Sequence, residues 1–384
     1  MSRNKKVNKF DQIIKIMEIS KKISSFGLSA KCEGKSRPLI ILFPAIFGPL
    51  TVVCAACAIK GTIESGENIE ASGAATLLAI GVFQATIKTV SVLLQEKKID
   101  FILRWIRNLY SNHKNESNSL FNGHMERAEK NFTKFSKYFF FRIFLYSFGS
   151  AFFILLIYMN LKGKLLLAFP YLSTNYFNTH TIGGSLLLFY DVINLAISES
   201  TMILIGIYLI ATLNILSDLI FSLNEKFQSG SDKQSNNSIL QQIVILHIEI
   251  LSKFREFCNI FDVVFAIQLF SSVLLLLFNF YLLMYSLTDF LYICLIGCIF
   301  CQLALFCLFG QKIHEKSERI FIDLYLTKWY EMDVKDQKIL LLIMKMSQKT
   351  LGLKAGGIYA IDSSMFVQVT KMCFSYATIL YTFL

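Results

Sequence analysis

Long apolar runs, each about the length of one membrane crossing, recur along the chain and are separated by polar segments. A helix needs about 20 apolar residues to cross the hydrocarbon core of a bilayer. Runs of this length predict seven transmembrane helices, at Pro38–Ile59, Ala71–Leu94, Phe139–Leu161, Ser185–Ser217, Val263–Leu287, Phe290–Gln311 and Gly356–Leu384. The pattern therefore predicts an all-α, polytopic membrane protein.

The basic residues lie mostly on one side of these predicted spans. Residues 1–37, 95–138, 218–262 and 312–355 hold 32 of the 38 Lys and Arg residues, while the segments on the other side hold three. Segments rich in Lys and Arg stay in the cytoplasm during membrane insertion. The distribution predicts a cytoplasmic N-terminus and an extracellular C-terminus.

This topology divides the chain into four parts. Residues 1–37 form a cytoplasmic N-terminal segment, whose basic side chains we expect to lie against anionic membrane lipid. Residues 38–311 hold the first six spans, residues 312–355 form a cytoplasmic helical anchor segment, and residues 356–384 form the seventh helix.

Two of the cytoplasmic segments carry apolar residues at helical spacing. One stripe fills Ser238–Phe261 and continues without interruption into the fifth span, and another extends from Ile320 to Met346. Such stripes bury one face of a helix. Two interpretations remain open: these helices pack on one another within the chain, or they form a cytoplasmic bundle that joins subunits.

The composition agrees with a membrane protein. Of 384 residues, 54% are hydrophobic and 17% are charged, and the mean hydropathy is +0.52. Soluble domains carry about 25% charged residues, so an ordinary soluble enzyme and a disordered chain are both excluded. The net charge of +11 marks the cytoplasmic side rather than a surface for nucleic acid, which we do not expect as a partner.

No pattern typical of an enzyme site is present. The five histidines are scattered without metal-ligand spacing, and there is neither a phosphate-binding glycine loop nor an H-E-x-x-H motif. Cys54 and Cys57 have redox spacing but lie inside the first span, where a thiolate is costly and small apolar packing is the simpler interpretation. We expect no enzymatic activity, no metal and no cofactor.

Charged residues within the spans are candidates for function. Lys88 lies near the end of the second run, where its long side chain can reach the headgroup layer. Glu199 either borders a wet cavity or is a neutral or interfacial carboxyl. A lone lysine in lipid costs about 2.5–3.5 kcal/mol, so Lys371 is expected to face water in a pore or to pair with Asp362 or Glu199.

The C-terminal third carries an ordered series of short motifs after the sixth span. Its members are Ser317, the Y-x-x-x-W step of Tyr325 and Trp329, Leu340–Leu342 with Ile343 and Lys345, Ala355-Gly356, and Phe366 followed by Ser375-Tyr376. From His247 to Leu384 the chain thereby resembles the insect odorant receptor family. Before His247 the resemblance rests on length, span number and topology.

The resemblance implies an odorant-gated, non-selective cation channel of four subunits in the plasma membrane of sensory neurons. An odorant-tuning subunit pairs there with a shared co-receptor subunit, and the last helix of each subunit lines the pore. Carried onto this chain, the pore residues are Ile379, Thr382 and Phe383. Ile379 and Phe383 share a helical face and can form apolar rings that gate by dewetting. The alternative is that this face packs against a neighbouring helix.

The resemblance also implies a ligand site in the outer half of the bundle. The candidate wall residues are Phe83, Phe148, Phe152, Leu155, Glu199, Met202, Tyr292, Cys294 and Ile296. Each of them alone is compatible with ordinary core packing. Together they predict a mostly apolar pocket that binds a small volatile odorant by shape and dispersion.

Three other classes of membrane protein remain as alternatives. A gustatory receptor channel of the same superfamily is nearest, but such receptors usually end in a Thr-Tyr…Gln-Phe helix, whereas this chain ends in Ser375-Tyr376…Thr382-Phe383. A G-protein-coupled receptor has its N-terminus outside, opposite to the orientation predicted here. A secondary transporter usually contains inverted repeats, and the sequence shows no internal repeat.

Overall fold

The computed structural model describes residues 37–64, 69–115, 163, 165–172, 175–228, 233–285 and 290–383. Eight α-helices lie within them: α2 (Arg37–Glu64), α3 (Ile69–Leu94), α4 (Glu96–Asn115), α7 (Phe177–Gln228), α8 (Lys233–Tyr285), α9 (Phe290–Tyr325), α10 (Val334–Ser347) and α11 (Ser363–Phe383). The short 3₁₀ helix η3 (Trp329–Glu331) precedes α10, and the strands β1 (Lys354–Ala355) and β2 (Tyr359–Ala360) follow it. The all-α prediction is confirmed.

Five of the described helices are long and apolar enough to cross a membrane: α2, α3, α7, α8 and α9. They contain the first, second, fourth and sixth predicted spans and the described part of the fifth. The third, Phe139–Leu161, lies outside the described residues. The seventh corresponds to α11, which is not among these five and whose 21 residues include regularly spaced polar side chains.

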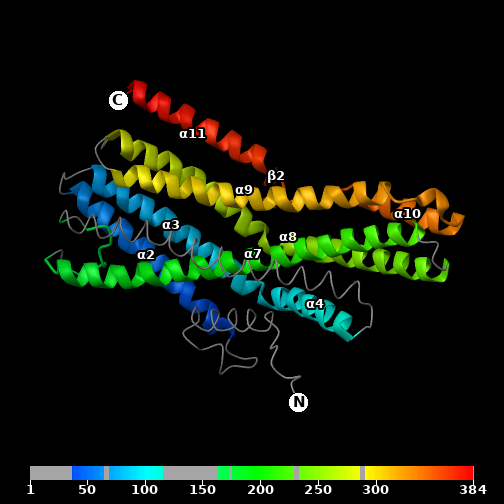
Figure 1. The fold of residues 1–384 in the computed structure, drawn as a ribbon. Coiled ribbons are helices and arrows are strands. Elements are labelled where there is room, and N and C mark those ends of the chain that lie inside the picture. Colours follow the sequence, from blue (N-terminus) through cyan, green and yellow to red (C-terminus); the bar gives the residue numbers. More distant parts are fainter. Residues whose placement is uncertain are drawn as a thin grey trace, which may run out of the picture.

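Three helices extend far beyond one membrane thickness. α7, α8 and α9 have 52, 53 and 36 residues, against the roughly 20 that one crossing needs. They run lengthwise through the molecule, with α2 and α3 beside one half and α4 and α10 beside the other (Figure 1). We call these halves the membrane bundle and the distal bundle. As predicted, the stripe at Ser238–Phe261 and the fifth span form one continuous helix, α8.

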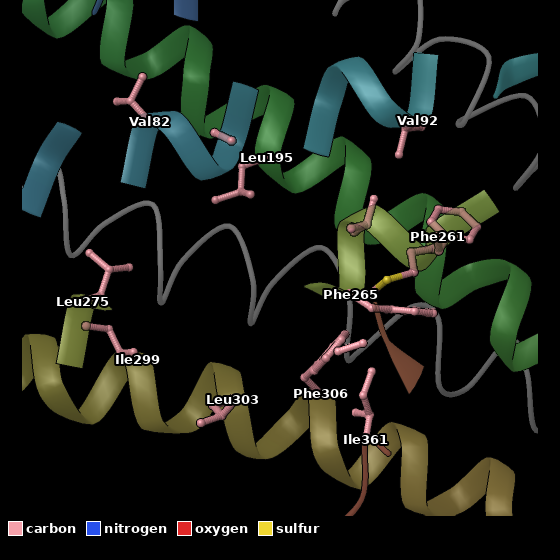
Figure 2. Close-up of a cluster of buried hydrophobic side chains, with 14 of the residues drawn as sticks. Val82, Val92, Leu195, Phe261, Phe265, Leu275, Ile299, Leu303, Phe306 and Ile361 are labelled. Atoms are coloured by element: carbon pink, nitrogen blue, oxygen red, sulfur yellow. The ribbon is translucent and has the colours of Figure 1, made fainter. Parts of the chain in front are cut away.

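The two bundles have separate hydrophobic cores. In the membrane bundle, Phe265 of α8 lies between Phe261 of the same helix and Phe306 of α9, with the Phe265 and Phe306 ring centroids 5.6 Å apart (Figure 2). In the distal bundle, residues of α4, α7, α8, α9 and α10 share a second cluster that includes Leu109, Leu216, Leu240, Ile243, Ile320, Leu324 and Ile343. The predicted cytoplasmic helices therefore do pack on one another within the chain.

The segment before α11 corrects the predicted start of the seventh helix. Residues predicted to begin the helix at Gly356 instead form the turn between β1 and β2, and α11 begins at Ser363. Gly356 and Gly357 have φ angles of +59° and +70°, a region that favours glycine and does not continue a right-handed helix. The length of an apolar run does not indicate this change of backbone conformation, so the helix start was predicted too early.

Asp362 caps α11 instead of lying inside a span. Its Oδ1 accepts hydrogen bonds from the Met365 backbone N–H at 2.9 Å and from the Ser364 hydroxyl at 2.8 Å. An acidic residue satisfies the free N–H groups of a first helical turn in this way. Burial alone raises the pKa of Asp362, but these hydrogen bonds outweigh burial and hold its pKa below the usual range.

The same segment is fastened to α8 and α9. The Gly357 N–H donates to Asp262 Oδ1 of α8 at 3.0 Å, and the Leu351 N–H donates to Ser317 Oγ of α9 at 2.8 Å. Gly310 of α9 lets the chain at Ile361 approach closely, since a Cβ built on Gly310 would lie 2.0 Å from the Ile361 carbonyl oxygen. These contacts fix the position at which α11 begins.

We expect Gly310→Ala to destabilise the protein by about 1–3 kcal/mol, because the added methyl group forces the backbone at Ile361 away from α9. The measurement is the thermal unfolding midpoint of the purified protein in detergent. Gly297→Ala on the same helix is the control, because nothing lies within 4 Å of its added Cβ. Equal midpoints for the two variants would contradict the close approach at Gly310.

Candidate functional site

One face of α11 packs on the membrane bundle. Met365, Val369, Cys373 and Ala377 recur every four residues, which places them on one side of the helix, and all are buried. The Phe374 ring also contacts the bundle, with its centroid 5.8 Å from that of Phe280 and 6.0 Å from that of Phe300. Towards its C-terminal end, α11 diverges from α9 (Figure 1).

The opposite face of α11 is polar. Six exposed polar residues recur at alternating spacings of four and three, and they are Ser364, Gln368, Lys371, Ser375, Thr378 and Thr382. With 3.6 residues per turn, this spacing forms a single stripe on the side opposite the buried residues. We call it the polar stripe. The prediction from sequence named three of its members separately but missed the stripe, although the spacing of all six is visible in the sequence.

The predicted pore residues lie differently with respect to the polar stripe. Thr382 belongs to it, and its hydroxyl donates to the Ile379 carbonyl oxygen at 2.7 Å. Ile379 lies beside the stripe with 52% of its surface exposed. Phe383 ends α11, and its side chain lies outside the described part of the chain. Lys371 is exposed, and no described carboxylate forms an ion pair with it.

A second group of polar residues lies inside the membrane bundle. The Lys88 ammonium of α3 donates hydrogen bonds to Glu199 Oε1 of α7 and to Gln268 Oε1 of α8. The Lys88 and Glu199 side chains are 0% and 4% exposed. The prediction that Lys88 reaches the headgroup layer is therefore wrong. A lysine remains buried in a membrane protein when a carboxylate and further hydrogen bonds compensate for its lost hydration.

Two glutamines complete this buried polar cluster. Gln84 of α3 and Gln302 of α9 each donate from Nε2 to Gln268 Oε1, at 2.8 and 3.4 Å. Gln268 Nε2 in turn donates to Ser272 Oγ at 2.9 Å. The cluster therefore links four helices. No sequence spacing indicates it, because its members come from four separate runs; the available signal was the presence of Lys88, Glu199 and three glutamines within otherwise apolar spans.

The candidate wall residues of the ligand pocket fall into three groups. Met202 and Tyr292 are fully buried, and Ile296 packs against the same core, while Glu199 belongs to the buried polar cluster. Phe83 is 49% exposed, and Cys294 is also exposed. The remaining three, which are Phe148, Phe152 and Leu155, lie outside the described residues.

The family-motif residues have distinct structural positions. Ser317 is buried and accepts the hydrogen bond that holds the segment after α10. Tyr325 and Trp329 lie at the end of the distal bundle and are 61% and 47% exposed. Ser375 belongs to the polar stripe, and Tyr376 is half-buried on the side of α11 that faces the bundle.

Comparisons with known proteins agree with one another. The family model described as 7tm Odorant receptor matches residues 68–374. Odorant receptor 22c of Drosophila melanogaster is 28% identical over 148 residues, which span 38% of this chain but only 37% of that relative's length. The olfactory receptor OR5 of Machilis hrabei in complex with eugenol has a similar fold, with a TM-score of 0.76 and 14% identity over 98% of this chain and 100% of that one. A second structure of OR5 gives a TM-score of 0.72 and 16% identity over 97% and 99% of the two chains.

Breaking the buried ion pair between Lys88 and Glu199 should lower the stability of the folded protein. We expect Lys88→Met or Glu199→Gln to destabilise the protein by about 3–5 kcal/mol, because each change leaves its former partner buried and uncompensated. The double variant, Lys88→Met with Glu199→Gln, should recover most of that loss. Thermal unfolding midpoints in detergent, arranged as a double-mutant cycle, measure these effects.

The Lys60–Glu64 pair of α2 is the control for this cycle. Its side chains are 78% and 67% exposed and lie 3.6 Å apart, so Lys60→Met should cost less than about 1 kcal/mol. If Lys88→Met lowered the unfolding midpoint as little as Lys60→Met, the buried cluster would not hold the helices together.

Proposed function

The chain belongs to the 7tm odorant receptor family, and on this premise we propose that it is the odorant-tuning subunit of an odorant-gated, non-selective cation channel. The channel contains four subunits, including a co-receptor subunit, and lies in the plasma membrane of sensory neurons. The N-terminus of each subunit is cytoplasmic and the C-terminus is extracellular.

The observation that carries this proposal is the polar stripe on α11. Its six polar residues face away from the membrane bundle, and nothing in the described part of the chain covers them. A face that contains a lysine is unfavourable against lipid tails. If four subunits surround an axis, their polar stripes line a water-filled path, and Ile379 supplies an apolar ring that closes it by dewetting.

The proposed ligand is a small volatile molecule. The similar olfactory receptor of Machilis hrabei forms a complex with eugenol, and its fold is shared along almost the whole of this chain. We propose that Ile296, which is only partly buried against the core of the membrane bundle, contributes apolar surface to the site of such a molecule. The ligand shifts the equilibrium between the closed and open states only by the difference between its affinities for the two states.

The assembly with other subunits is supported by the distal bundle. Large apolar side chains remain uncovered where α9, η3 and α10 meet, and they are Tyr325, Leu326, Trp329, Tyr330, Val334, Leu341 and Leu342. A concentration of exposed large apolar side chains is typical of a protein–protein interface. We therefore propose that the distal bundle, besides packing within the chain, contacts neighbouring subunits.

Whole-cell current tests the proposal. Cells express this chain alone, the co-receptor alone or both, and are exposed to a panel of volatile compounds that includes eugenol. We expect a fast ligand-evoked current only in cells that express both chains. The current should persist when K⁺ replaces Na⁺, because the pathway is non-selective among monovalent cations.

Two results would contradict the proposal. One is a signal that depends on a G protein without any ligand-evoked current. The other is ligand-driven uptake of a substrate, which would indicate a transporter.

A further inference from the structure

We infer that Lys371 sets the valence selectivity of the channel, by lowering the permeability of divalent cations relative to monovalent cations. This inference rests on the proposed function, because it requires α11 to line the ion path. It adds to that function a specific role for one side chain and a property that is measured separately from gating.

Lys371 is the only charged residue in α11, and it lies near the middle of the helix. Its neighbours along the polar stripe are Gln368, one turn before it, and Ser375, one turn after it. Both are uncharged, so neither neutralises the ammonium group. The two carboxylates that the sequence offered as partners, Asp362 and Glu199, are engaged elsewhere: Asp362 caps the helix, and Glu199 binds Lys88.

The position of Lys371 on α11 determines which environments its ammonium group can reach. The residues that α11 buries against α8 and α9 lie on the other side of the helix, so the ammonium group points away from its own bundle. Lipid tails are an unfavourable environment for it. Under the proposed function, water in a central path surrounds both the polar stripe and this charge.

An ammonium group beside an ion path acts on passing ions in proportion to their charge. At the same distance, a divalent cation is repelled twice as strongly as a monovalent one. At roughly 5 Å in water, this difference amounts to about a fourfold change in relative permeability for each lysine, and more where the path is narrow and poorly hydrated. The effect falls at high ionic strength, because salt screens the charge.

The test is the reversal potential of the odorant-evoked current in the full complex with the co-receptor. It is measured with Na⁺ inside and either Na⁺ or Ca²⁺ outside. We expect Lys371→Gln to raise the permeability of Ca²⁺ relative to Na⁺ about four- to tenfold. Lys371→Arg should retain the wild-type ratio, since it keeps the charge. The control, Lys345→Gln at the exposed end of α10, should also leave the ratio unchanged.

A second measurement avoids differences in folding or surface expression. Lys371→Cys channels already at the cell surface are modified with a cationic or an anionic thiosulfonate. The cationic reagent should restore the low Ca²⁺ permeability, and the anionic reagent should raise it further. Unmodified wild-type channels receive the same reagents to account for the native cysteines.

The outcomes separate this inference from the proposed function. If wild-type channels carry odorant-evoked current but Lys371→Gln leaves the permeability ratio unchanged, the inference is overturned and the proposed function stands. If Lys371→Gln mainly reduces assembly with the co-receptor and any remaining current keeps its ratio, the inference is also overturned, and Lys371 pairs with a neighbouring subunit instead. If no ligand evokes current in the wild-type complex, both the inference and the proposed function fail.

Discussion

The buried ion pair between Lys88 and Glu199 is the interaction on which the membrane bundle depends. Neither charge is tolerated alone in the apolar interior, and each is compensated by a group on another helix. Gln268 accepts hydrogen bonds from α3 and α9 at the same point, so α3, α7, α8 and α9 must keep one relative arrangement. An apolar contact tolerates sliding, whereas this network does not, because a shifted helix leaves a charge without its partner.

The position of α11 follows from a bundle that is already held together by other helices. It contacts α8 and α9 along one narrow face, and the segment before it is held by the hydrogen bonds of Gly357 to Asp262 and of Leu351 to Ser317. Its far end diverges from α9 (Figure 1).

Much of the fold was predictable from the sequence, and the limits of that prediction have physical causes. The length of apolar runs located five helices, since burial in lipid demands such runs. The start of α11 was missed because it depends on the positive φ angles of Gly356 and Gly357, although Asp362 is an ordinary capping residue. The burial of Lys88 was missed because its partner, Glu199, is 111 residues away and no local pattern joins them. The pocket candidates came from family resemblance and include both buried and exposed residues.

Whether the polar side of α11 lines the ion path is the question on which the proposed function depends. The most direct measurement compares Ser375→Cys, on the polar stripe, with Ala377→Cys, which faces the bundle, during odorant-evoked current. A membrane-impermeant cationic thiol reagent is applied to open channels, with the wild-type chain as the control for native cysteines. If the polar stripe lines the path, Ser375→Cys channels lose current rapidly and irreversibly, and Ala377→Cys channels change little. Equal rates of modification, or faster modification of Ala377→Cys, would contradict this arrangement.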